Sequence, residues 1–237
     1  MGFRGDGVTG MGRWGSGVMG RWGVGGTDMQ ARFSDEEFAK LKKILIVYEW
    51  GLKILLTKMQ IIYEDLANSR NASPIEHFKG RIKAPESIAE KLLGLGLEIT
   101  AENARKRLSD IAGIRIICSF AKDIYSMVDI LKSMPDANVR REKDYVSNPK
   151  PSGYRSFHLI IEIPVFYSGK TEGIPVEIQI RTAAMDFWAT LEHKVRYKYK
   201  EHIPQHLKDE LVTCADKISE LDDRMFLIHD IISLINQ

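Results

Sequence analysis

Two long stretches of the chain carry apolar side chains every three or four residues, a spacing that places them on one face of an α-helix. The first stretch begins with Ser34 and Glu37, which are spaced as in a capping box. Its apolar positions are Phe38, Leu41, Leu45, Tyr48, Leu52, Leu55, Met59, Ile62 and Leu66. In the second stretch, near the C-terminus, the positions are Leu207, Leu211, Cys214, Ile218, Leu221, Met225, Ile228 and Ile232. We therefore expect two long amphipathic helices, the second at about 205–235, that can pack on the core, on each other or on another subunit.

Between these two helices, strand-like and helix-like patterns alternate. Runs rich in valine and isoleucine predict strands at 114–120, 139–146, 157–163 and 176–181. Helical patterns cover 85–93, 124–134 and 182–199. This alternation predicts an α/β (α+β) fold with a mixed β-sheet flanked by helices, in which a cleft lies at the strand ends.

Residues 1–28 differ from the rest of the chain, because they hold 11 of its 19 glycines and contain MGRWG twice. Such a segment has too little apolar surface to offset the entropy that it loses on ordering. We expect a disordered extension at 1–28 and one domain at 29–237, with its core at about 74–199 and Met29 as a candidate functional start. The alternative is a tail that binds nucleic acid through Arg13, Trp14, Arg21 and Trp22.

The composition argues against several classes of protein. A formal net charge of +2 gives no sign of DNA binding. The sequence has neither an apolar run of membrane-spanning length nor the pattern of a secretory signal, so we expect a cytoplasmic protein. Cys118 and Cys214 lie in apolar stretches without metal-ligand spacing, and we interpret both as reduced, buried thiols. His202 and His206 are spaced for one helix face, but Pro204 between them disfavours a helical metal site.

One group of polar residues suits the phosphates of a nucleotide. Arg81 and Lys83 share a side of an extended segment, just before a helix N-terminus whose backbone N–H groups favour anions. Ser87 adds a hydroxyl, and Lys91 lies one turn further along the same helix face. Taken alone, this group is more typical of a solvated surface loop.

An acid and a base, Asp110 and Arg115, bracket a glycine turn that leads into the strand at 114–120. A carboxylate at such a position is available to hold Mg²⁺ against nucleotide phosphates. By itself, however, Asp110 is more simply interpreted as a turn residue.

A third group surrounds a loop rich in proline, serine and glycine that leads into the strand at 157–163. It contains Lys143, Lys150, Tyr154 and His158. A tyrosine in such a loop can stack on a purine base, while the basic groups neutralise phosphate charge. A polar hairpin connection with a half-buried Tyr154 explains this group equally well.

The strand at 176–181 alternates isoleucine and valine with Glu177, Gln179 and Arg181, so these three polar groups line one face of the sheet. An edge strand with a solvated face is the more common origin of this pattern. The helix that follows places Asp186, Thr190, His193 and Tyr197 along one side.

In this order, the segments GRIKAPES, DIAGIR, KPSGYRSFH, VEIQIRT and MDFWATLEHK closely resemble the synthetase domain of the RelA/SpoT alarmone enzymes. The resemblance runs from about residue 30 to the C-terminus, and without a hydrolase domain the chain looks like a small alarmone synthetase of the RelP type. The resemblance implies a nucleotidyltransferase-like fold. It also implies transfer of the β,γ-pyrophosphate of ATP to the 3′-hydroxyl of GDP or GTP, which yields ppGpp or pppGpp and AMP.

The resemblance also implies a role for each matching residue. Asp110 and Glu177 would hold Mg²⁺ and be catalytic, with Glu177 close to the acceptor 3′-hydroxyl. The residues implied for ATP binding are Arg81 and Arg115 around the adenine, with Lys83, Ser87 and Lys91 at the phosphates. Those implied for GDP or GTP are Tyr154 at the guanine, Lys143, Lys150 and His158 at the phosphates, Gln179 at the ribose, and Asp186.

The sequence departs from related chains at two places. Asp186 stands where RelQ relatives usually have asparagine, and Gly94 and Leu95 stand where relatives often carry basic residues. The resemblance further implies a homotetramer, to which the two apolar stretches could contribute, and nothing in the sequence supports RNA binding. Two other functions stay open: a binding module for guanine nucleotides or single-stranded RNA without turnover, and a nucleotidyltransferase that releases pyrophosphate.

Overall fold

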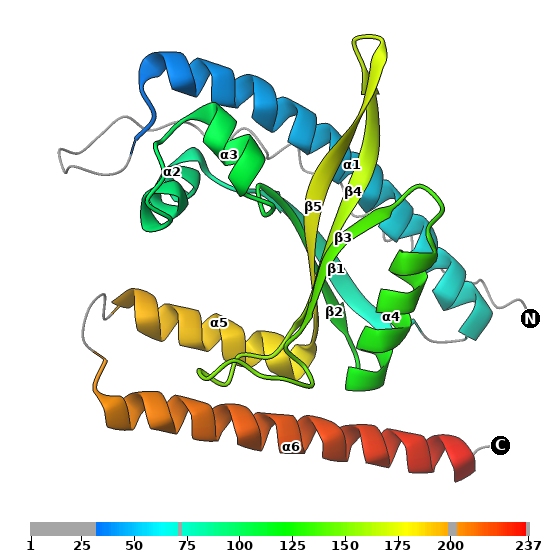
Figure 1. The fold of residues 1–237 in the computed structure, drawn as a ribbon. Helices are drawn as coiled ribbons and strands as arrows, with labels where there is room; N and C mark the ends of the chain where they lie inside the picture. Colours follow the sequence, from blue (N-terminus) through cyan, green and yellow to red (C-terminus); the bar gives the residue numbers. More distant parts are fainter. Residues whose placement is uncertain (1–31, 71–72, 199–202, 236–237) are drawn as a thin grey trace, which may run out of the picture. The chain divides into compact units, whose positions relative to one another are not determined.

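The computed structural model describes residues 32–70, 73–198 and 203–235 (Figure 1). The glycine-rich segment at 1–28 and His202 lie outside these residues, as does the side chain of Tyr197. The chain divides into two units, Met1–Gln30 and Ala31–Gln237, and everything described below belongs to the second.

A five-stranded sheet forms the centre of this unit, in the strand order β1-β2-β5-β4-β3. The strands are β1 (Ile75–Ile82), β2 (Ala112–Cys118), β3 (Asn138–Asp144), β4 (Phe157–Tyr167) and β5 (Lys170–Thr182). The β2–β5 pair is parallel, whereas β1–β2, β4–β5 and β3–β4 are antiparallel. The predicted mixed sheet is therefore confirmed.

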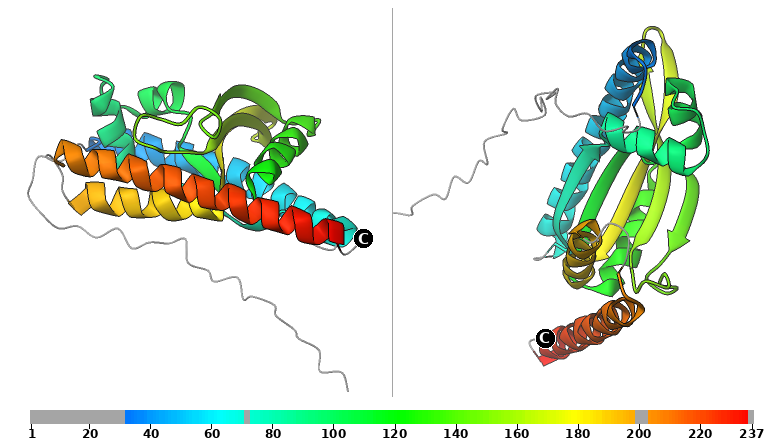
Figure 2. Two further views of the ribbon diagram at one scale, coloured as in Figure 1. Left: turned by 90° about the horizontal axis from the view of Figure 1, so that it is seen from below. Right: turned by 90° about the vertical axis from the view of Figure 1, so that its left-hand side faces the viewer.

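Six helices surround the sheet in the described part of the chain. They are α1 (Asp35–Arg70), α2 (Pro85–Gly94), α3 (Ala101–Arg107), α4 (Ala121–Ser133), α5 (Ala183–Lys198) and α6 (Gln205–Ile235). Helices α1 and α4 share one core cluster with the apolar face of the sheet, whereas α6 runs beside α5 (Figures 1 and 2). The opposite, more polar face of the sheet lies toward α5.

Two elements were missed by the sequence reasoning. Strand β1 was expected only as an extended segment around Arg81, because its glycine and charged residues hide the strand pattern. Helix α3 is only seven residues long, and its N-cap Thr100 accepts a hydrogen bond from the Asn103 N–H at 3.1 Å.

Strand β5 pairs on both sides, so the interpretation of 176–181 as an edge strand is wrong.

The predicted apolar face of α1 is confirmed, because Leu41, Leu55 and Met59 are completely buried in the core. The start of the helix also follows the sequence, since the Glu37 N–H donates to Ser34 Oγ at 3.3 Å. The Glu37 carboxylate in turn accepts a hydrogen bond from the Ala101 N–H at 2.7 Å, which joins α1 to the start of α3.

The predicted apolar face of α6 is largely solvent-exposed. Its inner side is rotated toward Leu211, Ala215 and Ile218, and Ala215 is the one fully buried α6 residue in the described structure. Because of this rotation, Cys214 is exposed and the prediction that both thiols are buried is wrong; Cys118 is buried as expected. Within the described residues, no helix combines the length and apolar character that crossing a membrane requires.

Neighbouring leucines in α2 allow a matched test of this packing. Leu92 is completely buried, whereas Leu93 is 54% exposed on the same helix. We expect Leu92→Ala to lower the free energy of unfolding by about 2–5 kcal/mol, because it removes apolar burial and leaves a cavity. Leu93→Ala should change it by less than about 0.5 kcal/mol. Urea unfolding followed by circular dichroism measures both, and equal losses would contradict the packing described here.

Candidate active site

Strand pairing gathers the polar residues of β2, β4 and β5 on one face of the sheet. In the parallel pair, Arg115 lies opposite Gln179 and Gly113 lies opposite Glu177. In the antiparallel pair, His158 lies opposite Gln179. Side chains alternate along a strand, so residues from three separate sequence blocks share this face while the isoleucines between them face the core.

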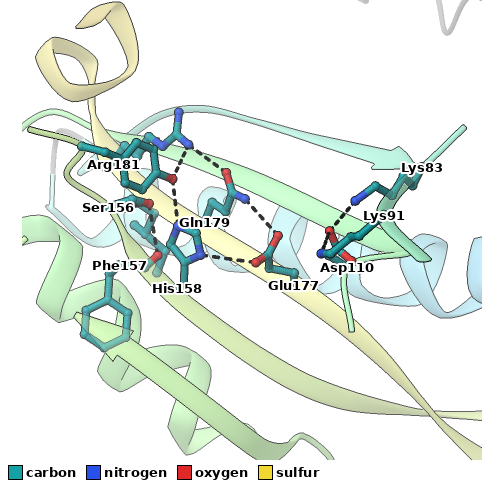
Figure 3. Close-up of polar contacts among 11 residues, drawn as sticks. Lys83, Lys91, Asp110, Ser156, Phe157, His158, Glu177, Gln179 and Arg181 are labelled. Atoms are coloured by element: carbon teal, nitrogen blue, oxygen red, sulfur yellow. Dashed lines mark hydrogen bonds and ion pairs between the residues drawn. The ribbon is translucent and has the colours of Figure 1, made fainter. Parts of the chain in front are cut away.

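Asp110, which lies just before β2, is held by two lysines. Its Oδ2 accepts hydrogen bonds from Lys83 Nζ at 2.5 Å and from Lys91 Nζ at 2.6 Å (Figure 3). Burial alone would raise the pKa of Asp110, but the two ammonium groups outweigh it and lower the pKa below its usual value. The other carboxylate oxygen, Oδ1, is buried and has no hydrogen-bond partner in the described structure.

Glu177 is one member of a closed ring of polar contacts that also contains Gln179, Arg181, Tyr154 and His158. Arg181 donates to Tyr154 Oη at 2.6 Å and to Gln179 Oε1 at 2.9 Å, and Gln179 donates to Glu177 Oε2 at 2.9 Å. On the other side, Tyr154 Oη lies 2.8 Å from His158 Nε2, and His158 Nδ1 lies 3.3 Å from Glu177 Oε1 (Figure 3). The catalytic candidate Glu177 is thus tied to the stacking candidate Tyr154 by two routes.

His158 lies between Tyr154 and Glu177 and contacts both. Tyr154 Oη accepts from Arg181 and shares a hydrogen bond with His158 Nε2. His158 Nδ1 donates a hydrogen bond to Glu177 Oε1. Burial raises the pKa of Glu177, but the hydrogen bonds from His158 and Gln179 outweigh it, so the pKa lies below its usual value. Glu177 is therefore ionised at neutral pH.

Asp110 and Glu177 line one cavity of about 280 Å³, together with Arg81, Arg115, Gln179 and Asp186. The negative charge of Asp110 also raises the pKa of Glu177, which is the effect of two nearby carboxylates on each other. Two carboxylates from distant parts of the chain thus meet in one cavity.

A second cavity of about 430 Å³ shares Arg81, Arg115 and Gln179 with the first and adds Tyr154 and Arg181. Its remaining wall is α5, from which Thr190 and His193 contribute as the helical spacing predicted. The two arginines implied for the adenine therefore lie between the two cavities.

Asp186 joins the two sides of the site. Its Oδ1 lies 3.1 Å from Arg115 Nη1 and accepts a hydrogen bond from Arg181 Nη1 at 3.0 Å. Arg181 is the main residue that the sequence reasoning did not assign, although it was placed on the polar face of its strand. Only 5% of Arg181 is exposed, and a buried arginine requires partners such as these.

Aromatic and basic groups gather around the loop between β3 and β4. Lys150 Nζ lies 4.7 Å from the ring centre of Tyr145 and 4.8 Å from that of Tyr154. Lys143 lies opposite His158 across the β3–β4 pair. Tyr145, which was not assigned a role from sequence, contacts Tyr154 and His158 edge-to-face.

Ser87, Gly94 and Leu95 contribute less to the two cavities. Ser87 lies in the first turn of α2 and lines neither cavity. The same holds for the predicted site residues Lys83, Lys91, Lys143, Lys150 and His158, which lie around the cavities. Gly94 and Leu95 are exposed, so no basic side chain from these positions reaches the site.

The carboxylates suit a magnesium ion. Asp110 Oδ1 is a buried oxygen without a hydrogen-bond partner among the described residues, and Glu177 presents a second ionised carboxylate to the same cavity. Mg²⁺ prefers oxygen ligands and is usually held by one or two carboxylates together with substrate phosphates. The described residues contain no group of three or more potential metal-ligating side chains.

Comparison with known proteins places this site in a family. Residues 80–202 match the model described as the region found in RelA / SpoT proteins. The chain is 48% identical to the GTP pyrophosphokinase YwaC of Bacillus subtilis over 184 residues, which cover 78% of this chain and 88% of YwaC. It is 36% identical to the GTP pyrophosphokinase YjbM of the same organism, over 78% of this chain and 86% of YjbM.

Solved structures agree with this assignment. The small alarmone synthetase 2 of Bacillus subtilis superimposes with a TM-score of 0.72 at 46% identity, over 80% of this chain and 97% of that one. The small alarmone synthetase 1 bound to its product pppGpp gives a TM-score of 0.77 at 34% identity, over 82% and 99%. The chain therefore belongs to the RelA/SpoT family, with the small alarmone synthetases among its relatives.

Proposed function

We propose that the chain is a GTP diphosphokinase, which transfers the β,γ-pyrophosphate of ATP to the 3′-hydroxyl of GDP or GTP. The products are ppGpp or pppGpp, with AMP as the by-product. The observation that carries this proposal is the meeting of Asp110 and Glu177 in one cavity between a lysine pair and an aromatic loop. The relatives named GTP pyrophosphokinase support the same reaction.

On the donor side, Lys83 and Lys91 supply positive charge beside Asp110, as phosphates require. Arg81 and Arg115 line both cavities, a location that suits the proposed stacking on the adenine. Ser87 is proposed to reach the phosphates from the first turn of α2, where backbone N–H groups also favour anions.

Asp110 and Glu177 are proposed to hold Mg²⁺. Two observations support this: Asp110 Oδ1 has no hydrogen-bond partner in the described structure, and the lowered pKa of Glu177 keeps that carboxylate ionised. When bound, Mg²⁺ would neutralise phosphate charge as the β-phosphorus is attacked. The lysines leave Asp110 Oδ1 free by engaging only Oδ2, which keeps one oxygen available for this role.

On the acceptor side, Tyr154 is proposed to stack on the guanine, while Lys143, Lys150 and His158 face the phosphates. Gln179 is proposed to contact the ribose, and Asp186 the guanine base. Glu177 would accept a hydrogen bond from the 3′-hydroxyl and orient it. Because its pKa is lowered, Glu177 contributes more through position and charge than by binding a proton in the resting state.

The identity of the products separates this reaction from the two alternatives. A binding module would bind GDP without forming AMP, and a nucleotidyltransferase would release pyrophosphate from ATP. Chromatography of a mixture of ATP, GDP, Mg²⁺ and the protein distinguishes all three, and the absence of any nucleotide conversion by folded protein would refute the proposal.

We further propose that the protein is cytoplasmic and forms a homotetramer. The support is the outer side of α6, where Leu221, Met225 and Ile228 are 60%, 52% and 50% exposed in the single chain. Exposed apolar stripes of this kind mark protein–protein contacts. The segment 1–28 is proposed to be an extension outside the catalytic domain at 29–237.

Replacement of Glu177 by glutamine tests the catalytic role. Glu177→Gln keeps the size of the side chain but removes its charge, so kcat should fall by about 10²–10³-fold. GDP binding should survive, because Tyr154 and the lysines remain. Glu210→Gln, an exposed change on α6, serves as the matched control and should retain full activity. Nucleotide chromatography gives both rates, and an active Glu177→Gln variant would rule out the assigned role.

Two substitutions at Tyr154 separate its ring from its hydroxyl. Tyr154→Ala removes the proposed stacking surface, which is worth about 1–3 kcal/mol, so the KM for GDP should rise about 5- to 150-fold. Tyr154→Phe keeps the ring and loses only the bonds to Arg181 and His158, so its effect should be smaller. The KM for ATP should be unchanged in both. Initial rates at varied GDP and ATP measure these values, and a similar rise for both nucleotides would contradict the assignment.

The lysine pair around Asp110 predicts a pH-dependent stability. Because the folded-state pKa of Asp110 is lowered, its ionised form stabilises the fold above the unfolded pKa of about 3.9, and this contribution is lost as the pH falls through the folded value. Lys83→Met should therefore destabilise the protein at pH 7 and much less at about pH 3. Urea unfolding at both pH values tests this, with the exposed Lys122→Met as control. A loss that is independent of pH would contradict the linkage.

A further inference from the structure

The loop that carries Tyr154 rests on helix α6. This loop, residues 145–156 between β3 and β4, is called the acceptor loop below and lies beside α5 and α6 (Figure 1). Its Tyr154 ring packs against a small apolar cluster of Trp188 and Ala189 from α5 and Ala215 from α6. The cluster is separate from the main core, so the ring depends on α6 for part of its support.

The closest contact lies at Gly153. Its φ of +86° belongs to the left-handed region that favours glycine, and a Cβ added there would lie only 2.6 Å from Ala215 Cβ. The same atom would lie 3.4 Å from Val212 Cα and 3.5 Å from the Trp188 ring. The backbone of the acceptor loop therefore lies directly against α6, with no room for a side chain between them.

Arg155 ties both ends of the loop to the helix. It donates to Asp216 Oδ1 on α6 at 3.1 Å and to the Val146 carbonyl at 3.3 Å. Within the loop, the Gly153 N–H donates to the Lys150 carbonyl at 2.8 Å. Through Arg155, the start and the end of the loop are thus connected to one side chain of α6.

Helix α6 is in turn fixed to α5. Trp188 Nε1 donates to the Leu211 carbonyl at 3.0 Å, and Thr182 Oγ1 donates to Asp222 Oδ2 at 2.6 Å. Thr182 also accepts the Met185 N–H at 3.2 Å, so it links α6 to the first turn of α5. The same turn carries Asp186, which contacts Arg181 on the opposite side of the site.

We propose that α6 positions the acceptor loop, and that Asp216 and Asp222 are positioning residues for acceptor-nucleotide binding although neither lines the catalytic cavities. Asp216 acts on the loop through Arg155. Asp222 acts on the first turn of α5 through Thr182, the last residue of β5. The donor residues Lys83, Lys91 and Asp110 have no bond to α6 in the described structure, so α6 should influence the two nucleotides unequally. This inference rests on the proposed function, because it takes Tyr154 as part of the acceptor site.

The test compares how each substitution changes the KM for GDP and the KM for ATP. Asp216→Ala removes a partly exposed ion pair, so the KM for GDP should rise about two- to fivefold. Asp216→Ala combined with Asp222→Ala should raise it about tenfold, with the KM for ATP and kcat at saturating GDP unchanged. Asp230→Ala is the control, because this exposed α6 residue has no polar contact within the described chain. Circular dichroism verifies that each variant is folded.

A double-mutant cycle tests the route through Arg155. In an Arg155→Met background, Asp216→Ala should have no further effect, because its partner is already absent. Additive effects would overturn the route, and equal changes for GDP and ATP, or no change in either, would overturn the inference.

Calorimetric titration with GDP separates this inference from the proposed reaction. If the wild type makes no alarmone but Asp216→Ala weakens GDP binding, the positioning role stands and the reaction fails. If the wild type makes alarmone and the variants bind GDP as the wild type does, the reaction stands and the positioning role fails.

Discussion

The parallel pairing of β2 with β5 is the constraint on which the site depends. It lies in the interior of the sheet and sets Gly113 beside Glu177 and Arg115 beside Gln179. Because Asp110 directly precedes β2, the same register carries it to the cavity that Glu177 lines. A shift by one residue would turn Glu177 and Gln179 toward the core, where isoleucines now pack. The hydrophobic alternation of β5 therefore fixes the geometry of the candidate active site as well as the fold.

Charge in the site is arranged so that both carboxylates stay ionised despite burial. Asp110 is kept so by the two lysines, and Glu177 by donors from His158 and Gln179. The two carboxylates differ in the groups that hold them. The two lysines bring positive charge that suits phosphates, whereas Glu177 is held by one hydrogen bond each from His158 and Gln179. This asymmetry fits a donor side that binds polyphosphate and an acceptor side that receives a hydroxyl group.

Much of this arrangement could be predicted from sequence, because it is written in local patterns. The strand alternation of 176–181 placed Glu177, Gln179 and Arg181 on one face, and the seam of α1 predicted its buried side. Strand β1 escaped detection, since its partner β2 rather than its own composition makes it a strand. The hydrogen-bond ring through Arg181 was not predicted, because it joins residues of β4, β5 and the loop before β4 whose proximity only the tertiary structure creates.

Helix α6 shows why an apolar pattern alone does not define a buried face. Its strict three-and-four spacing predicted a seam through Cys214 and Leu221, yet the helix turns smaller and polar residues, Ala215 and Asp222, toward α5 and the acceptor loop. A Cβ at Gly153 would lie only 2.6 Å from Ala215 Cβ, so the loop and the helix pack without a side chain between them at this point. The larger apolar side chains are thereby left on the outer side, where the proposed homotetramer would bury them. In such an assembly, contacts between subunits would hold the helix that supports Tyr154. Assembly and acceptor binding would then both depend on α6.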